Sequence, residues 1–231
     1  MSDSIDILMS TYNGENFIRD QLDSILNQSV NAWRLIIRDD GSSDNTRQII
    51  LDYQKHAPEK IFFVEDAEEN LGACQSFFRL MAHSSGQYIF FCDQDDVWVH
   101  NKIELQINAM RAREANCSAE CPILVHSDLK VVNEYLELLS GSLWEYQNIK
   151  PKSMRGLNRV LVQNYVTGCT MLVNKSLLEC AEFNSVRPIM HDWWMLLIAT
   201  VRGEVVSMEE ATVLYRQHAK NDIGAVRWSL F

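Results

Sequence analysis

The sequence predicts an α/β protein with a doubly wound, mostly parallel β-sheet flanked by helices. In the first half of the chain, short apolar runs alternate with segments whose apolar residues recur at helical spacing. The apolar runs show no polar alternation, which is typical of strands buried on both faces. Hydrophobic residues make up 47% of the 231 residues, enough to bury a sizeable core.

The elements of the first half follow one another as strand and helix. The expected strands are residues 5–9, 35–37, 61–64 and 88–92, and the expected helices carry apolar residues at 17–26, 49–53 and 77–81. After residue 99 the pattern loosens into a helix at 102–115, a strand at 123–125, a polar stretch at 134–152 and a second helical region. We therefore expect one domain in two lobes, residues 1–98 and 99–231.

Composition excludes several classes of protein. The chain has 21 basic and 31 acidic residues, and a net charge of -10 argues against binding of nucleic acid by bulk electrostatics. Six scattered cysteines favour reduced thiols. No targeting segment precedes the first strand, and the longest apolar stretch, 193–201, is too short to span a bilayer. These features predict a cytoplasmic protein and allow peripheral contact with the inner face of a membrane.

Polar clusters follow three of the expected strands, at residues 10–14, 39–44 and 93–96. In a doubly wound sheet, ligands bind beyond the carboxyl ends of the strands, where such loops converge. We therefore expect the three clusters to form one site.

Asp93 and Asp95 emerge directly from a buried strand, and paired carboxylates suit Mg²⁺ or Mn²⁺. Asp96 adds a third acid, whose repulsion a cation or a proton would relieve. The alternative is a solvated acidic turn that caps the next helix.

The other two clusters also have plain structural readings. Residues 39–44 can form a strand-to-helix turn with a helix cap, but two adjacent acids, Asp39 and Asp40, could instead accept the imide N–H of a uracil or thymine ring. Residues 11–15 could form a simple turn. Alternatively, they could contact a nucleoside through a hydroxyl, an aromatic edge and backbone N–H groups.

Taken together and in this order, the motifs resemble the family 2 glycosyltransferases of GT-A fold. They are Ser10-Thr11-Tyr12-Asn13, Asp39-Asp40-Gly41-Ser42-Ser43-Asp44, Asn70-Leu71-Gly72, Asp93-Gln94-Asp95-Asp96-Val97-Trp98, Val166-Thr167-Gly168-Cys169 and His191-Asp192. The closing segment, Tyr215-Arg216-Gln217-His218 followed by Asn221 and Gly224, is similar to that of bacterial rhamnosyltransferases. Two departures stand out: the chain ends soon after this segment, and His191 stands where many relatives carry an acid.

The resemblance implies a role for each motif. Asp192 would be the catalytic base, and Asp93, Asp95 and His218 would hold Mn²⁺ or Mg²⁺. The nucleotide sugar would be bound by Thr11, Tyr12, Asn13, Glu15, Asp39, Asp40, Asn70, Gly72, Asp93, Gln94 and Arg216. Gly168, Trp193 and Trp194 would lie on the acceptor side, although both tryptophans also fit a core position.

The implied reaction is inverting transfer of a sugar from a nucleoside diphosphate to a saccharide or lipid-linked saccharide. The closing segment favours dTDP-L-rhamnose as donor and bacterial cell-surface polysaccharide as product. Two alternatives stay open at this point. One is a phosphohydrolase resembling haloacid dehalogenases, with Asp93 as nucleophile; the other is a non-catalytic module that binds nucleotide sugars.

Overall fold

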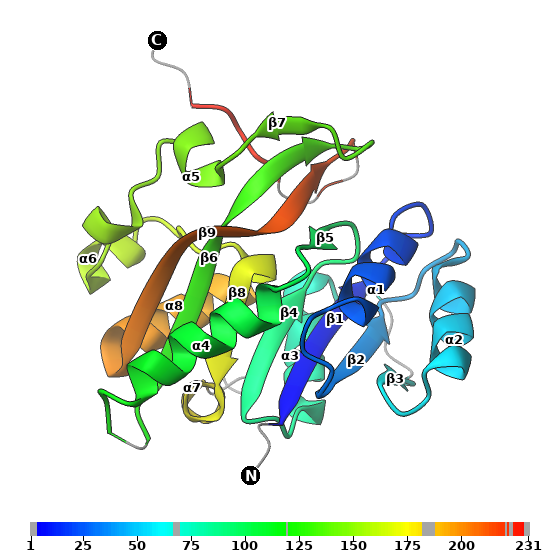
Figure 1. Cartoon of the computed structure of the whole chain (residues 1–231), viewed down its shortest axis with the longest axis horizontal. Helices are drawn as coiled ribbons and strands as arrows, with labels where there is room; N and C mark the ends of the chain where they lie inside the picture. The colour runs from blue at the N-terminus through cyan, green and yellow to red at the C-terminus, as the bar shows by residue number, and fades with distance from the viewer. Residues whose placement is uncertain are drawn as a thin grey trace.

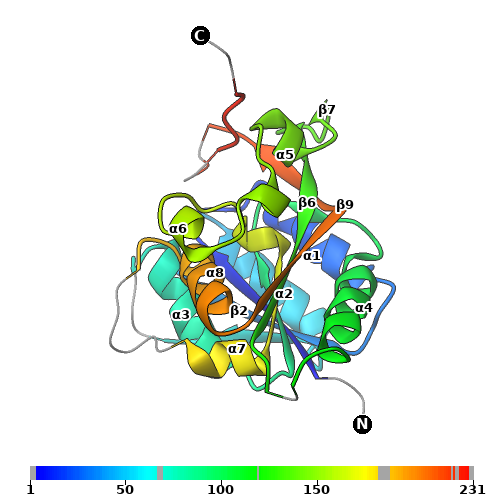
Figure 2. The same ribbon diagram turned by 90° about the vertical axis from the view of Figure 1, so that its left-hand side faces the viewer.

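The computed structural model describes residues 4–66, 70–118, 120–181, 188–219, 221 and 224–228. The predicted fold class is confirmed, because helices cover both faces of one curved, mixed sheet (Figures 1 and 2). The strands are β1 (Ile5–Thr11), β2 (Trp33–Asp39), β3 (Ile61–Val64), β4 (Tyr88–Cys92), β5 (Val97–Trp98), β6 (Ile123–Asn133), β7 (Leu138–Ser140), β8 (Met171–Asn174) and β9 (Glu204–Gln217). The helices are α1 (Ile18–Leu26), α2 (Thr46–His56), α3 (Ala73–His83), α4 (Lys102–Glu114), α5 (Leu143–Tyr146), α6 (Leu157–Val160), α7 (Lys175–Cys180) and α8 (His191–Arg202), with 3₁₀ turns η1 (Pro151–Ser153) and η2 (Gly168–Thr170).

The sheet has the strand order β3-β2-β1-β4-β8-β6-β9-β5, with β7 paired to β6. Its first four strands run parallel, whereas β8 lies antiparallel between β4 and β6. The last strand in the sequence, β9, pairs in parallel with β6 and antiparallel with β5. The carboxyl ends of β1, β2 and β4 therefore meet at one edge, as the sequence predicts.

Successive residues of the central strands contribute to two separate cores. Ile7 and Met9 of β1 pack in one core under α1, α2 and α4, and Leu8 packs in the other under α3, α7 and α8. Phe90 and Phe91 of β4 divide in the same way. Because side chains alternate across a strand, apolar residues at every position are what a sheet covered on both faces requires.

The second half differs most from the sequence prediction. The strand predicted at 123–125 continues to Asn133, and the 14-residue strand β9 was not predicted. The stretch 134–152, expected to be merely polar, contains β7, α5 and the beginning of η1. No helix in the described ranges is long and apolar enough to cross a bilayer. The division into lobes at residue 98 stays a prediction.

Candidate functional site

A cleft of about 690 Å³ opens beyond the carboxyl ends of β1 and β4. Many of the predicted site residues line it: Thr11, Tyr12, Asp40, Asn70, Gly72, Asp93, Gln94, Asp95, Gly168, Asp192 and Trp193. Asn13, Glu15, Asp39, Trp194, Arg216 and His218 are not among its lining residues, although Asn221, close to His218, is. The structure thus gathers most predicted residues and gives the others supporting positions.

The loop after β1 is tied to the start of α2. Asn13 adopts a positive φ of 48°, and its side-chain oxygen accepts a hydrogen bond from the Ser43 N–H at 2.8 Å. The Glu15 carboxylate accepts bonds from the backbone and side chain of Asn45 at 3.0 and 2.7 Å. Both side chains predicted to bind nucleotide therefore bind the protein, because the unpaired N–H groups at the start of α2 need acceptors.

The two acids after β2 also bind protein groups. Asp39 accepts the Thr11 hydroxyl at 2.9 Å and the Ser42 N–H at 2.9 Å. Asp40, only 4% exposed, pairs with Arg38 at 2.7 Å.

Asp40 also fixes the loop that follows β3. Its carboxylate accepts the N–H groups of Leu71 and Gly72 at 2.9 and 2.8 Å. Asn70 and Gly72 have positive φ values of 55° and 79°, and at Gly72 this conformation favours glycine. The carboxylate predicted to read a base is thus engaged in shaping the cleft wall.

The Arg38 guanidinium is fully buried and also binds Asp66 at 2.7 Å. No pattern in the sequence distinguishes this arginine from a surface residue.

Gln94, in the acidic cluster after β4, joins the loop after β4 to the loop after β1. The Gln94 amide accepts the Tyr12 N–H at 2.9 Å and donates to the Tyr12 carbonyl at 2.8 Å. A Cβ at Gly14 would lie 2.2 Å from the Gln94 side-chain oxygen. Glycine at position 14 therefore makes room for this clasp.

Asp95 meets the closing segment of the chain. Its carboxylate lies 2.8 Å from His218 Nε2, and the Asn221 amide donates to it at 3.4 Å. The His218 ring stacks on Phe17 with a centroid distance of 4.4 Å. The structure thus brings together two of the three predicted metal ligands, Asp95 and His218, from positions 123 residues apart in the chain.

Asp96 is fully buried behind the cleft. Its carboxylate accepts the Arg216 N–H at 3.1 Å, and it lies with Asp93 and the Cys169 sulfur in a group whose ligand atoms are within 4.8 Å of one another. Burial, followed by repulsion from Asp95 and Asp93, raises the pKa of Asp96 well above its usual value. Burial, followed by the charges of Asp96 and Asp93, raises the pKa of the Cys169 thiol, so this sulfur is protonated and a poor ligand for Mg²⁺.

Arg216 supports the acidic loop from behind. Its guanidinium donates to the Asp95 carbonyl, the Glu134 carbonyl and the Asp20 carboxylate, each at 2.7 Å, and the residue is 3% exposed. These bonds engage Nε, Nη1 and Nη2. Arg216, predicted to bind the nucleotide sugar, therefore holds the Asp95 loop in place and lies outside the residues that line the cleft.

The donor set at this end of the cleft fits a divalent cation. Asp93 and Asp95 offer hard oxygen atoms, and His218 adds an imidazole already directed at the Asp95 carboxylate. Burial first, and then repulsion from Asp95 and Asp93, raises the pKa of the neighbouring Asp96, and a cation would relieve that repulsion.

Asp192 lies across the cleft at the start of α8. It is 7% exposed, and burial raises its pKa to about 6, partly offset by hydrogen bonds from Trp193, Gly168 and Asn164. A carboxylate with this pKa is ionised near neutral pH yet more basic than an exposed one. Its environment therefore fits the predicted role of a base.

His191 is the acceptor-side residue to which the sequence assigned no role. It is 3% exposed, its ring lies 4.0 Å from the ring of Phe77, and neither ring nitrogen has a hydrogen-bond partner among the described residues. A Cβ at Gly168 would lie 2.9 Å from His191 Nε2 and 3.7 Å from an Asp192 oxygen. Burial lowers the pKa of His191 to about 3, so the ring is neutral and offers one donor and one acceptor to the cleft.

The two tryptophans separate. Trp193 lines the cleft and anchors α8 by donating from Nε1 to the Val160 carbonyl at 2.6 Å. Trp194 packs against the second core and is absent from the cleft lining, in keeping with the core alternative. All six cysteines are free thiols.

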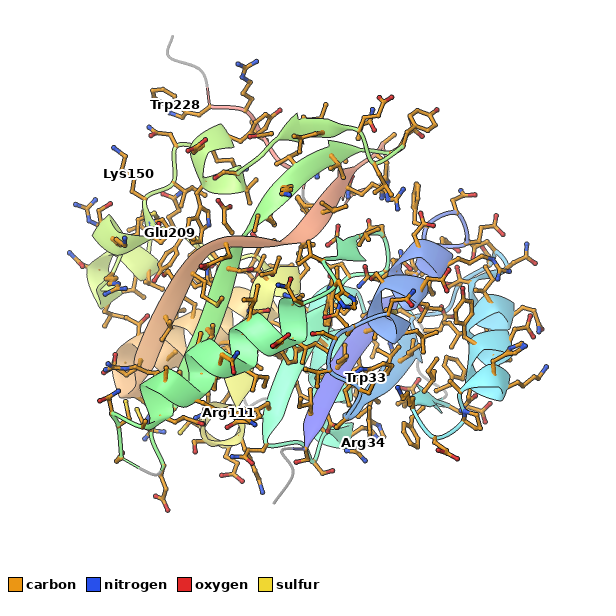
Figure 3. The ribbon with its side chains drawn as sticks, in the orientation of Figure 1. Trp33, Arg34, Arg111, Lys150, Glu209 and Trp228 are labelled. Carbon is orange, nitrogen blue, oxygen red and sulfur yellow. The ribbon has the colours of Figure 1, made fainter. Side chains whose placement is uncertain are left out.

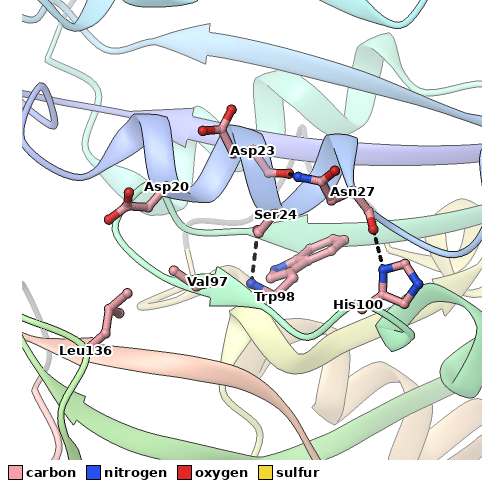
Figure 4. Close-up of a pocket in the computed structure, with 8 residues that line it drawn as sticks. All are labelled: Asp20, Asp23, Ser24, Asn27, Val97, Trp98, His100 and Leu136. Carbon is pink, nitrogen blue, oxygen red and sulfur yellow. Dashed lines mark hydrogen bonds between the residues drawn. The ribbon is translucent and has the colours of Figure 1, made fainter.

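A second hollow, of about 310 Å³, lies between α1 and β5 (Figure 4). Figure 4 shows two of its polar side chains already engaged, with Ser24 bound to the Trp98 N–H at 3.0 Å and His100 bound to the Asn27 carbonyl at 2.5 Å. None of the predicted site residues lines it, so the site lies in the larger cleft.

Comparison with known proteins agrees with this geometry. Residues 6–181 match the model of the family described as Glycosyl transferase family 2. The chain is 30% identical over 229 residues to the dTDP-rhamnosyl transferase RfbG of Shigella flexneri, covering 94% of this chain and 74% of that protein. It is 27% identical over 195 residues to the UDP-Glc:alpha-D-GlcNAc-diphosphoundecaprenol beta-1,3-glucosyltransferase WfgD of Escherichia coli, covering 84% and 69% of the two chains.

Solved structures share the fold at low identity. The S. aureus TarS fragment 1–349 in complex with UDP-GlcNAc superposes with a TM-score of 0.67 at 16% identity, over 94% of this chain. The mannosyltransferase PcManGT of Pyrobaculum calidifontis, in complex with GDP-Man and Mn²⁺, gives 0.68 at 14% identity over 96% of this chain. This chain covers 60% and 58% of those two chains.

Proposed function

The chain belongs to glycosyl transferase family 2, and on that premise we propose that it transfers a sugar from a nucleoside diphosphate to a hydroxyl of a saccharide acceptor, with inversion at the anomeric carbon. The observation that carries the proposal is the placement of one buried carboxylate, Asp192, across a single cleft from Asp93 and Asp95. One wall thus offers a base, and the other offers ligands for a charged diphosphate.

The acceptor hydroxyl binds on the Asp192 side of the cleft. Asp192 takes the hydroxyl proton as the oxygen attacks the anomeric carbon from the face opposite the leaving diphosphate, which inverts the configuration. The N–H groups of Trp193 and Gly168 hold the carboxylate in place while it does so. Gly168 leaves the space beside His191 and Asp192 in which the hydroxyl can approach.

The donor binds on the side of Asp93 and Asp95. Asp93, Asp95 and His218 are the residues that would hold Mn²⁺ or Mg²⁺, and such an ion, when bound, neutralises charge on the leaving diphosphate. The Gln94 clasp on Tyr12 and the Asp40 bonds to residues 71 and 72 fix the loops against which the nucleoside lies. The function of these two polar residues is to preorganise the nucleotide site.

Support for a particular donor comes from relatives. The dTDP-rhamnosyl transferase of S. flexneri is the relative at 30% identity, and its name together with the closing segment at 215–218 favours dTDP-L-rhamnose. The E. coli relative acts on a diphosphoundecaprenol-linked sugar, as its name states, which favours a lipid-linked acceptor and a role in bacterial polysaccharide synthesis. The phosphohydrolase alternative fits less well, because Asp93 follows β4 after three strand–helix units.

The test is a donor panel. Purified protein is incubated with Mn²⁺ or Mg²⁺, an acceptor mixture and dTDP-L-rhamnose, UDP-glucose, UDP-GlcNAc or GDP-mannose, and released nucleotide is measured. We expect the greatest release from dTDP-L-rhamnose, dependent on both acceptor and metal. Failure of every donor to bind or turn over would refute the proposed activity, whereas turnover of a different donor would refute only the choice of sugar.

A further inference from the structure

We propose that residues 150–163, together with the exposed side chains of Arg227 and Trp228, form a surface that docks on an anionic lipid bilayer. Residues 150–163 comprise η1, α6 and the turns beside them, and we call this segment the basic rim. In Figure 1 the rim and α2 lie at opposite ends of the molecule, and in Figure 2 α6 is turned toward the viewer.

The charge of the basic rim is opposite to that of the protein as a whole. Its four charged residues, Lys150, Lys152, Arg155 and Arg159, are all basic and all exposed. No acidic residue occurs between Glu145 and Glu179, although the whole chain carries a net charge of -10. A cluster of cations in an acidic protein is the pattern expected of a surface that meets anionic lipid, because each cation near such a surface is attracted to the negative headgroups.

Most of these cations are available to a partner. Lys152 pairs with Glu209 at 2.6 Å, but both side chains are about 75% exposed, so the pair is weak and readily exchanged. Lys150, Arg155 and Arg159 form no ion pair with any residue that the structure describes. Figure 3 shows the Lys150 side chain pointing away from the body of the protein.

Exposed aliphatic side chains lie among the cations. Leu157, Leu161 and Val162 are 43%, 59% and 80% exposed, whereas Val160 between them is buried. Helical hydrogen bonds continue past α6, so Leu157 and Leu161 share one face, whereas Arg155 lies just before the helix and Arg159 lies within it. Apolar and basic side chains presented together are typical of a segment that lies in the headgroup region of a bilayer.

The basic rim is the outer side of the cleft wall. Ile149 before it and Asn164 after it both line the cleft. Docking through the rim would therefore bring the acceptor side of the cleft to the bilayer, where a lipid-linked acceptor is held. This last step rests on the proposed function, but docking itself does not.

A second contact point lies close to the rim. Trp228 is 49% exposed, and its N–H donates to the Tyr146 carbonyl at 3.0 Å, which places it against α5 (Figure 3). Arg227 beside it is also exposed. Tryptophan next to a cation is frequent where proteins meet the membrane interface.

The composition of the rim favours lipid over a saccharide. Residues 150–163 contain no aromatic residue on which a sugar ring could stack, and no carboxylate to bind its hydroxyls. An acidic protein partner would satisfy the cations but would not require the aliphatic side chains between them.

The experiment measures binding of the full chain to vesicles without nucleotide or sugar. Vesicles of phosphatidylglycerol with phosphatidylcholine are compared with pure phosphatidylcholine by co-sedimentation at low and high salt. We expect binding to the anionic vesicles that weakens with salt. Arg155→Glu/Arg159→Glu should reduce it by about tenfold or more, and Leu161→Ser/Val162→Ser should reduce it severalfold.

The matched control is Arg47→Glu/Lys55→Glu on α2, whose side chains are 58% and 72% exposed. It makes the same change of net charge at the opposite end of the molecule and should keep wild-type binding. Equal loss in this control would show that net charge alone governs binding and would overturn the proposal, as would absence of binding to anionic vesicles. Absence of binding to anionic vesicles would favour an acidic protein as the partner of the basic rim.

Circular dichroism shows whether each variant is folded, and turnover of a soluble acceptor is expected to stay at the wild-type level in all three. Loss of vesicle binding with turnover intact supports docking through the rim. Vesicle binding by a protein that transfers no sugar would refute the proposed function and leave docking standing.

Discussion

The two walls of the cleft use polar residues in different ways. On the donor side, Asp40 of the cleft wall and Asn13, Glu15 and Asp39 behind it are all bound to other protein groups. On the acceptor wall, His191 has two buried nitrogens without a partner in the part of the chain that the structure describes. A buried polar group that the protein leaves unsatisfied is costly, so such a group marks a place where a ligand or water must bind. Satisfied groups near a cleft give it shape, and unsatisfied ones give it specificity.

The largest effect should come from the acceptor wall. Asp192→Asn keeps the size of the side chain but removes the base, so kcat should fall by about 10²–10⁴-fold. Donor binding, measured by calorimetry with the nucleoside diphosphate and metal, should be unchanged. Loss of donor binding would instead place Asp192 on the donor wall.

A donor-wall change should act first on stability. Asp40→Asn removes one of the two carboxylates paired with the buried Arg38, the other being Asp66, and we expect the free energy of unfolding to fall by about 2–4 kcal/mol. Urea unfolding measures it, and Asp39→Asn, whose partners are neutral, is the control with a smaller loss. If Asp40→Asn weakened donor binding without loss of stability, Asp40 would be a nucleotide ligand as the sequence predicts.

The pH dependence of kcat/KM is expected to report on Asp192, on the acceptor wall. A base with a pKa of about 6 is lost by protonation, so kcat/KM should fall about tenfold per pH unit below pH 6 and level off above it. His191, with a pKa of about 3, stays neutral across this range and does not contribute to the limb. The Asp192→Asn variant should lack the limb; a limb retained in that variant would assign it to another group.

His191 itself offers the sharpest contrast between stability and function. His191→Phe keeps the ring against Phe77 and removes two unpartnered nitrogens, so stability should be unchanged or slightly higher. Catalytic efficiency should fall about fivefold to tenfold, because about one hydrogen bond to the substrate is lost. Steady-state kinetics and thermal unfolding are measured together, and unchanged kinetics would show that water, not substrate, meets this ring.

The smallest effect is expected at Glu15. Glu15→Gln weakens its bonds to Asn45 at the exposed start of α2, which should lower stability by about 0.5 kcal/mol and leave donor KM unchanged. Thermal unfolding and donor titration test both parts. A severalfold rise in donor KM would return Glu15 to the nucleotide site.

The sequence predicts the elements of the first half well because each one carries a local signal. Strands 35–37, 61–64 and 88–92 are unbroken apolar runs, strand 5–9 is interrupted only by Asp6, and the loops after three of the four contain the polar clusters. The family motifs then identify the cleft, and Asp95 and His218 meet as the resemblance implies. Features of the fold that depend on a local run of residues can therefore be predicted from the sequence.

The roles of individual side chains were harder to predict because they depend on distant partners. Whether Asp40 reads a base or binds residues 71 and 72 depends on how the loop after β3 folds back. Lys102 resembles a surface lysine in sequence, yet it is fully buried, bound to Gln106 at 2.6 Å and Thr212 at 3.2 Å, and burial lowers its pKa to about 8. Strand β9 was missed because its residues are only half-buried along much of its length and show no clear alternation.

Strand β9 also sets the order in which the protein can become active during its synthesis. The strands β1 to β4 can pair as soon as the first 92 residues are available, but β9 lies between β6 and β5 and delivers His218 to Asp95 and Arg216 to Asp20. A nascent chain in which residues 216–221 are still inside the ribosome therefore lacks the side chains that contact Asp20 and Asp95. The loop at Asp95 therefore reaches its final contacts only after residue 221 has left the ribosome.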